Sequence, residues 1–205
     1  MEVESYRILA ERVDLSDRPP PARAIVERMI HATADLSFAD SARIGAAAPQ
    51  ALFDALAAEA PVIVDAAMVT AGITRYPTRC YLPEVPVAPE GSTRSAAAFR
   101  LAAGEHPEGA VFVCGNAPTA LFELLDLHAA GLVRPAAVVG LPVGFVGAKE
   151  SKAALWASPL APISITNEGE RGGSPPAAGA VNAIVRRVAA AQAAAATRAD
   201  AGGGS

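Results

Sequence analysis

Short apolar runs recur along the chain and alternate with segments of helical periodicity. Four runs are rich in β-branched residues and alanine, at residues 61–65, 110–114, 136–139 and 163–165. Continuous hydrophobicity of this kind is typical of strands in a parallel sheet, because both of their faces are buried. The proline-rich segment 75–89 is expected to be a loop, with one further short strand at residues 79–81.

Helical periodicity fills most of the intervening segments. It predicts helices over residues 22–34, 49–59, 66–71, 93–103, 118–128 and 148–157, and a last helix from about Pro176. Strands that alternate with helices in this order form a parallel sheet covered on both faces. We therefore predict a three-layer α/β/α fold with a mostly parallel sheet.

The first predicted helix carries a candidate proton donor. A buried stripe is indicated by the spacing of Ile25, Val26, Met29 and Ile30. His31 stands beside this stripe, three residues after Arg28, and is one of only three histidines in the chain. Histidine is the side chain best suited to proton transfer near neutral pH. On spacing alone, however, the pattern favours a hydrogen-bonded core histidine over a catalytic one.

Polar residues and glycines follow each predicted strand. The segments concerned are residues 65–75, 115–120, 140–151 and 166–174. Ligands of open parallel sheets bind beyond the carboxyl ends of the strands, so these segments indicate a ligand site. Common nucleotide signatures are absent, since no glycine directly precedes Lys149 and no G-x-G-x-x-G occurs. No nucleophile elbow and no spacing of metal ligands is present, so no metal site is expected.

Composition narrows the possible partners. The formal net charge of −4 argues against nucleic acid, and an acidic ligand would need locally placed arginines. No apolar run is long enough to predict a membrane span. The acidic start does not resemble a signal peptide, so we expect a cytoplasmic location.

Chain length and composition also predict the domain organisation. The 205 residues suit one domain, assigned to residues 1–187. Residues 188–205 are rich in alanine and glycine, and we expect a flexible tail in which order fades after about Arg187. Alanine nevertheless favours helix on propensity alone.

Several segments together resemble the precorrin-8X methylmutase family of cobalamin (vitamin B12) biosynthesis. They are Arg28-Met-Ile-His31-Ala-Thr33, Val64-Asp65-Ala-Ala-Met68, Gly91-Ser-Thr93-Arg94-Ser95, Gly115-Asn116-Ala-Pro118-Thr119-Ala, Gly140-Leu-Pro-Val-Gly144-Phe-Val-Gly147-Ala-Lys149-Glu-Ser151-Lys and Arg171-Gly172-Gly173-Ser174. The resemblance extends from about Glu4 to Ile184. It implies an isomerase that moves a methyl group from C11 to C12 of precorrin-8X, giving hydrogenobyrinate. It also implies a homodimer with active sites at the subunit interface.

The resemblance assigns roles to individual residues. His31 matches the family's catalytic histidine, and Ser5, which is followed by Tyr6, matches a serine in an N-terminal serine–aromatic pair. The expected substrate-binding residues are Ser5, Arg28, Thr33, Arg94, Asn116, Thr119, Gly144, Gly147 and Arg171. The implied reaction is a formal 1,5-sigmatropic shift, so no cofactor is expected.

The residue types agree with such a substrate. A flat corrin precursor edged with carboxylates needs guanidinium groups for its rim and apolar walls for its ring. Arg28, Arg75, Arg94 and Arg171 are candidate partners for the rim. A histidine can protonate the macrocycle and make it a better acceptor for the migrating methyl group.

Other interpretations remain open at this stage. The substrate is either metal-free precorrin-8X or cobalt-precorrin-8, which would give cobyrinate. A non-catalytic corrinoid carrier would need the arginines but no proton donor. An enzyme for a phosphate ligand would use the glycine loops, although the P-loop lysine spacing is missing.

Overall fold

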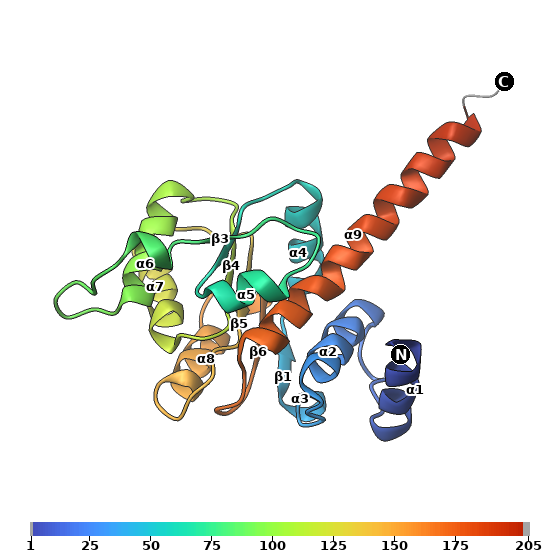
Figure 1. Cartoon of the computed structure of the whole chain (residues 1–205), viewed down its shortest axis with the longest axis horizontal. Helices are drawn as coiled ribbons and strands as arrows, with labels where there is room; N and C mark the ends of the chain where they lie inside the picture. The colour runs from blue at the N-terminus through green and yellow to red at the C-terminus, as the bar shows by residue number, and fades with distance from the viewer. Residues whose placement is uncertain (1, 203–205) are drawn as a thin grey trace.

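A six-stranded sheet forms the middle layer of the molecule (Figure 1). The computed structural model describes residues 2–202. Its strands are β1 (Ala42–Ile44), β2 (Val62–Val64), β3 (Arg79–Cys80), β4 (Val111–Cys114), β5 (Ala137–Gly140) and β6 (Ser164–Asn167). The strand order is β1-β6-β5-β4-β2-β3, and every neighbouring pair is parallel except β1 with β6.

Helices cover both faces of this sheet. They are α1 (Glu2–Arg12), α2 (Pro20–Thr33), α3 (Phe38–Ser41), α4 (Ala48–Ala57), α5 (Ala67–Gly72), α6 (Arg94–Glu105), α7 (Pro118–Ala129), α8 (Ala148–Ala157) and α9 (Ser174–Gly202). Short 3-10 turns at Leu82–Glu84 and Ala161–Ile163 complete the described elements. Within residues 2–202, no helix is both long and apolar enough to cross a membrane.

The alternation of side chains along each strand builds two separate cores. On β4, Val111 and Val113 pack into the core covered by α2, α4, α5 and α9. Phe112, between them, packs into the core covered by α6, α7 and α8. Successive residues of a strand point to opposite faces, so this central strand is buried on both sides. The predicted three-layer α/β/α fold is confirmed.

The elements predicted from periodicity are present with boundaries shifted by a few residues. Besides the two short 3-10 turns, three elements escaped prediction: helix α1, the short helix α3 and edge strand β1. Strand β1 lies antiparallel to β6, with Arg43 opposite Thr166. A three-residue strand of this kind depends on its distant partner and leaves almost no local hydrophobic pattern.

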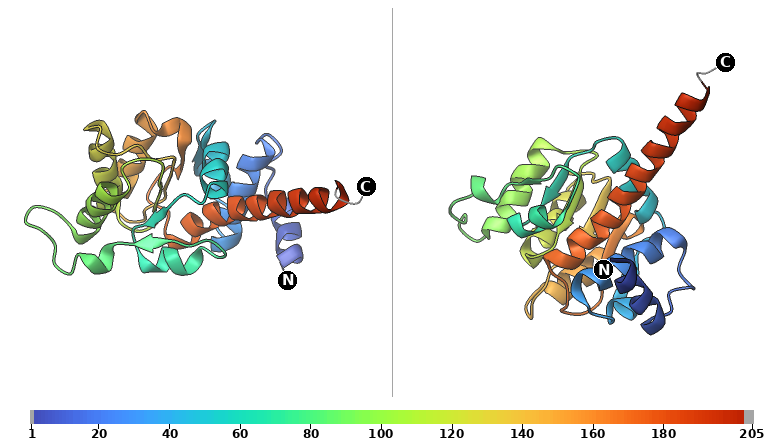
Figure 2. Two further views of the ribbon diagram at one scale, coloured as in Figure 1. Left: turned by 90° about the horizontal axis from the view of Figure 1, so that it is seen from above. Right: turned by 45° about the vertical axis from the view of Figure 1, so that its right-hand side comes forward.

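Helix α9 differs from the prediction at its carboxyl end. It is buried against α2, α4 and α5 up to Val188. It then continues to Gly202, past Arg187 where order was expected to fade, and projects from the body of the molecule (Figure 2). The high helix propensity of the alanine run explains this continuation. The division into a domain of residues 1–187 and a tail of residues 188–205 stays a prediction.

Candidate active site

Helix α2 presents His31 in its last turn. Two prolines in its first turn suit the start of a helix, and Ala34 ends it in the left-handed conformation while donating to the carbonyl of Ile30. The predicted stripe is buried against α9: Ile25, Val26, Met29 and Ile30. His31 itself is half-buried, and its ring meets α1, which packs beside α2.

Three predicted residues come together at this helix pair. Ser5 Oγ of α1 lies 2.9 Å from His31 Nδ1. The Tyr6 ring stacks on the His31 ring, with centroids 5.0 Å apart and planes 7° from parallel. Arg28 Nη1 donates to Tyr6 Oη over 3.1 Å. The cluster of Ser5, Tyr6, Arg28 and His31, which we call the α1–α2 cluster, therefore joins the proton donor to a guanidinium group.

The contact with Ser5 leaves the other ring nitrogen of His31 available for chemistry. Within residues 2–202, no hydrogen bond engages His31 Nε2. A serine hydroxyl can accept a hydrogen bond from Nδ1–H, and that form persists whether or not Nε2 carries a proton. The arrangement therefore suits a histidine that gives and retrieves a proton at Nε2.

Arg171 lies close to the same end of α2. Its Nη1 donates to Asp35 Oδ2 and, over 3.4 Å, to Ser37 Oγ. Partial burial opposes ionisation of Asp35, but hydrogen bonds from Ser37 and Arg171 hold the pKa of its carboxyl below the ordinary value. The ion pair thus ties the loop after β6 to the segment after α2. Thr33 closes the last turn by donating to the carbonyl of Met29 over 2.8 Å.

The sheet reverses its direction of winding between β2 and β4, where ligands of such sheets commonly bind. The buried Asp65, directly after β2, organises this point. Its carboxylate accepts backbone N–H groups of Gly115, Asn116 and Ala117 over 2.6–2.9 Å. Burial raises the pKa of Asp65, and these three hydrogen bonds oppose that rise. The loop after β4 is consequently fixed, with Asn116 and Thr119 exposed.

Two predicted glycines shape the loop after β5. Gly144 has φ 146° and Gly147 has φ 80°, conformations that other residues adopt only with strain. Gly147 also caps α8 against Pro118, which a Cβ would approach to 3.2 Å. Between them, Phe145 is 91% exposed and Val146 is 88% exposed. The loop therefore displays two apolar side chains at the carboxyl edge of the sheet.

Arg94 is the first residue of α6 and Thr119 is the second residue of α7, and both helices cover the opposite face of the sheet from α2. Arg94 donates to the carbonyls of Val85 and Leu82, over 2.7 Å and 3.1 Å. Thr119 Oγ1 lies 2.7 Å from Thr93 Oγ1, at the start of α6. The single chain does not bring these two residues into contact with the α1–α2 cluster.

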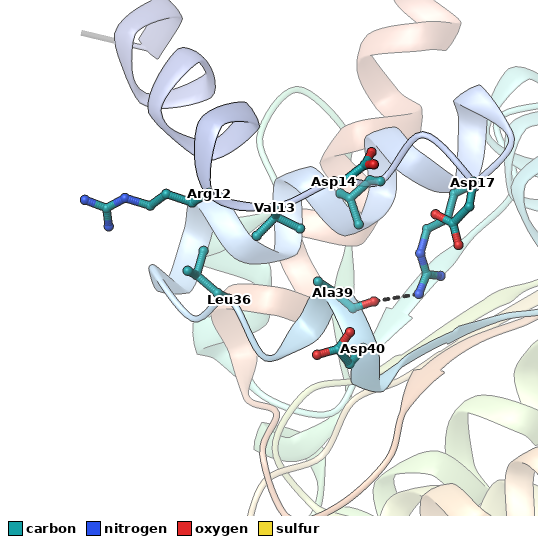
Figure 3. Close-up of a pocket in the computed structure, with 9 residues that line it drawn as sticks. Arg12, Val13, Asp14, Asp17, Leu36, Ala39 and Asp40 are labelled. Carbon is teal, nitrogen blue, oxygen red and sulfur yellow. Dashed lines mark hydrogen bonds between the residues drawn. The ribbon is translucent and has the colours of Figure 1, made fainter.

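A cavity of about 520 Å³ lies beside the carboxyl end of α1 (Figure 3). It is lined by Arg12, Val13, Asp14, Leu15, Asp17, Arg18, Leu36, Ala39 and Asp40. The Arg12 guanidinium points away from the other side chains in Figure 3, and Arg18 donates to the carbonyl of Ala39. The lining has three aspartates against two arginines, so this cavity does not suit a ligand edged with carboxylates.

Sequence patterns did not identify Tyr6 as a partner of His31, nor Asp35 as the partner of Arg171. They also missed the role of Lys152, a buried residue of α8 whose amine donates to Asn167 Oδ1 and to the carbonyl of Arg171. Each of these contacts joins segments at least 15 residues apart. Two of these residues left a signal: Tyr6 as the aromatic member of the Ser5–Tyr6 pair, and Lys152 as the last residue of the glycine-rich motif that begins at Gly140.

Comparison with known proteins gives one consistent result. The family described as precorrin-8X methylmutase matches residues 1–187. A precorrin-8X methylmutase of Pseudomonas aeruginosa is 42% identical, over 88% of this chain and 91% of the relative. A cobalt-precorrin-8 methylmutase of Methanothermobacter thermautotrophicus is 40% identical, over 89% of each chain.

Solved structures agree with the sequence comparison. The structure of a precorrin-8X methylmutase from Thermus thermophilus superimposes with a TM-score of 0.83 and 34% identity, covering 93% of this chain and 96% of that chain. A protein described as related to precorrin-8X methylmutase gives a TM-score of 0.78 and 35% identity, covering 88% and 98%. The chain therefore belongs to the precorrin-8X methylmutase family, isomerases of cobalamin biosynthesis that shift a methyl group within one molecule.

Proposed function

We propose that this protein moves a methyl group from C11 to C12 of a corrin precursor, with His31 as the proton donor. The observation that carries the role of His31 is its Nδ1 contact with Ser5, which leaves Nε2 for the substrate. Protonation draws electron density from the macrocycle and so favours migration of the methyl group with its bonding electrons. Substrate and product are isomers, so the donated proton returns to the enzyme within each turnover.

The substrate-binding residues follow from their positions around the carboxyl edge of the sheet. Arg28, Arg94 and Arg171 supply guanidinium groups for the carboxylates of the ring. Asn116 and Thr119 are exposed after β4 and can donate hydrogen bonds to the same rim. Gly144 and Gly147 shape the loop that carries Phe145, an apolar wall for the flat ring. Ser5 acts through His31, and Thr33 stays a predicted contact.

We further propose a homodimer whose active sites lie at the subunit interface. The α1–α2 cluster is separated from Arg94 and Thr119 within one chain. The exposed Phe145 and Val146 offer apolar area for a second subunit to bury. A second subunit over this edge would complete the walls around a ring too large for one chain to enclose. The cytoplasmic location stays a prediction.

The test is an absorbance time course with precorrin-8X and, separately, cobalt-precorrin-8. We expect wild type to convert at least one of them to its corrin product, and His31→Ala to lose about 100-fold or more in kcat. His106→Ala is the matched control, because His106 is bound to Tyr81 on another part of the surface; this variant should keep wild-type activity.

Each contrary outcome has a distinct meaning. Binding of both substrates without conversion by any variant would overturn the isomerase and indicate a corrinoid carrier. Conversion by wild type and His31→Ala at equal rates would keep the isomerase and remove His31 as its acid.

A further inference from the structure

Tyr6 contacts two functional side chains at once, although the proposed reaction gives it no role. Its ring lies parallel to the His31 imidazole, with centroids 5.0 Å apart. Its hydroxyl accepts a hydrogen bond from Arg28 Nη1 over 3.1 Å. The side chain is half-buried between α1 and α2. It therefore links the proposed proton donor to a proposed carboxylate partner.

The stack supplies a constraint that the contact with Ser5 cannot supply. A single hydrogen bond at Nδ1 fixes the position of one ring atom, but the imidazole can still tilt about that contact. A flat ring stacked 7° from parallel removes the tilt. With Nδ1 and the ring plane both fixed, the direction of the Nε2–H bond is fixed as well. Orientation of a reacting group to this degree contributes strongly to catalytic rate.

The hydroxyl of Tyr6 sets the second orientation. Arg28 and His31 are three residues apart on α2 and so lie on one face of that helix. By accepting from Arg28, Tyr6 holds the guanidinium on the same side as the imidazole. A guanidinium carries its N–H donors in one fixed plane, so holding that plane also fixes the directions in which the group can donate. One tyrosine thus fixes the spacing between the proton donor and a binding group for the rim of the substrate.

We propose that Tyr6 is a positioning residue, which holds the plane of the His31 imidazole through its ring and the Arg28 guanidinium through its hydroxyl. This inference rests on the proposed catalytic role of His31. The two parts of the Tyr6 side chain then have separate roles: the ring governs the chemical step, and the hydroxyl governs substrate binding. A residue that merely anchored α1 would not show such a division.

Two substitutions separate these functions. Tyr6→Phe keeps the stacked ring and removes the acceptor for Arg28; we expect kcat within about threefold of wild type and KM raised about three- to tenfold. Tyr6→Leu keeps an apolar side chain but removes the ring; we expect kcat to fall about 10- to 100-fold, with KM raised as in Tyr6→Phe. The steady-state assay uses the substrate that wild type converts, and circular dichroism confirms that each variant is folded.

The ¹⁵N NMR signals of the histidine rings give a readout that does not depend on activity. The chain has three histidines, so the His31 signals are assigned by their loss in His31→Gln. Wild type and Tyr6→Phe should show one tautomer at His31. Tyr6→Leu should show a mixture of tautomers, because the imidazole is then free to tilt away from Ser5.

The proposal is overturned if folded Tyr6→Leu keeps the wild-type kcat and a single His31 tautomer. It is also overturned if Tyr6→Phe and Tyr6→Leu lose kcat equally, because the ring would then have no separate role. Failure of the proposed function looks different: wild type would convert neither substrate, or His31→Gln would remain as active as wild type. In that case the NMR signals still decide whether Tyr6 holds the imidazole.

Discussion

A buried lysine holds the loop that carries Arg171. Lys152 is 1% exposed, and its amine donates to Asn167 Oδ1 over 3.1 Å and to the carbonyl of Arg171 over 2.5 Å. Burial lowers the pKa of Lys152 from 10.5 to about 8, because an ammonium group away from water is penalised. The folded protein therefore loses this proton at a lower pH than the unfolded chain does.

The sign of the resulting pH dependence follows from proton binding. Between roughly pH 8 and pH 10.5 the unfolded chain binds more protons at this site, so stability rises with pH. Below about pH 8 Lys152 is charged in both states, so the free energy of unfolding is lowered by the full cost of burying the ammonium group. Relative to Lys152→Met, we expect the free energy of unfolding of wild type to increase by about 3 kcal/mol across this range. Urea unfolding at several pH values measures the difference.

Lys149 provides the matched control, since it lies on the same helix and is exposed. Lys149→Met has the same change in net charge, and its stability should follow that of wild type as the pH rises. Equal pH dependence in wild type and Lys152→Met would show that the buried amine does not carry this cost.

At single residues, local sequence motifs predicted the chemistry and missed the partners. His31, Ser5 and Arg28 were predicted, and they meet. The stacking of Tyr6 on His31 was not predicted, because it depends on how α1 docks against α2. The contacts of Asp65 also depend on tertiary packing, because its three backbone partners lie about 50 residues further along the chain.

At the level of elements, helices and strands that bury a continuous apolar face were predictable. Helix α1 was missed because its sequence is largely polar and its order comes partly from local ion pairs of Arg7 with Glu4 and Glu11 and from its contact with α2. Strand β1 was missed because only its pairing with β6 defines it. Elements made by distant contacts leave weak local patterns.

Helix α9 allows a test at this scale. Residues 189–197 are exposed, whereas Ile184, Val185 and Val188 are buried in the core. Removing residues 189–205 exposes little apolar surface, so we expect the melting temperature to change by less than about 2 °C. Differential scanning calorimetry measures this change. A large decrease would show that the projecting part of α9 stabilises the fold.

A second truncation makes the comparison specific. Removal of residues 183–205 also deletes the three buried side chains, each worth about 1.5–3 kcal/mol when fully buried. This protein should melt at least about 10 °C lower than wild type or fail to fold. Similar melting temperatures for the two truncations would contradict the burial of α9 as the structure shows it.

At the scale of the whole molecule, the carboxyl edge of the sheet combines chemistry with exposed apolar side chains. Phe145 and Val146 stand almost fully exposed between two glycines of positive φ. An aromatic side chain removes about 150–250 Å² from water when buried, so leaving Phe145 exposed has a clear free-energy cost. The proposed homodimer recovers this energy and closes the site with the same contact.

Phe145→Asp tests that arrangement, because a buried carboxylate without a partner opposes association. We expect wild type to sediment as a dimer and Phe145→Asp as a monomer, with at least about a tenfold loss in kcat/KM. Leu132→Asp is the control: Leu132 is also exposed, but it precedes β5 and so lies at the opposite edge of the sheet. It should remain dimeric and active. A dimeric, fully active Phe145→Asp would place the interface elsewhere, whereas a monomeric protein of wild-type activity would show that each chain completes its own site.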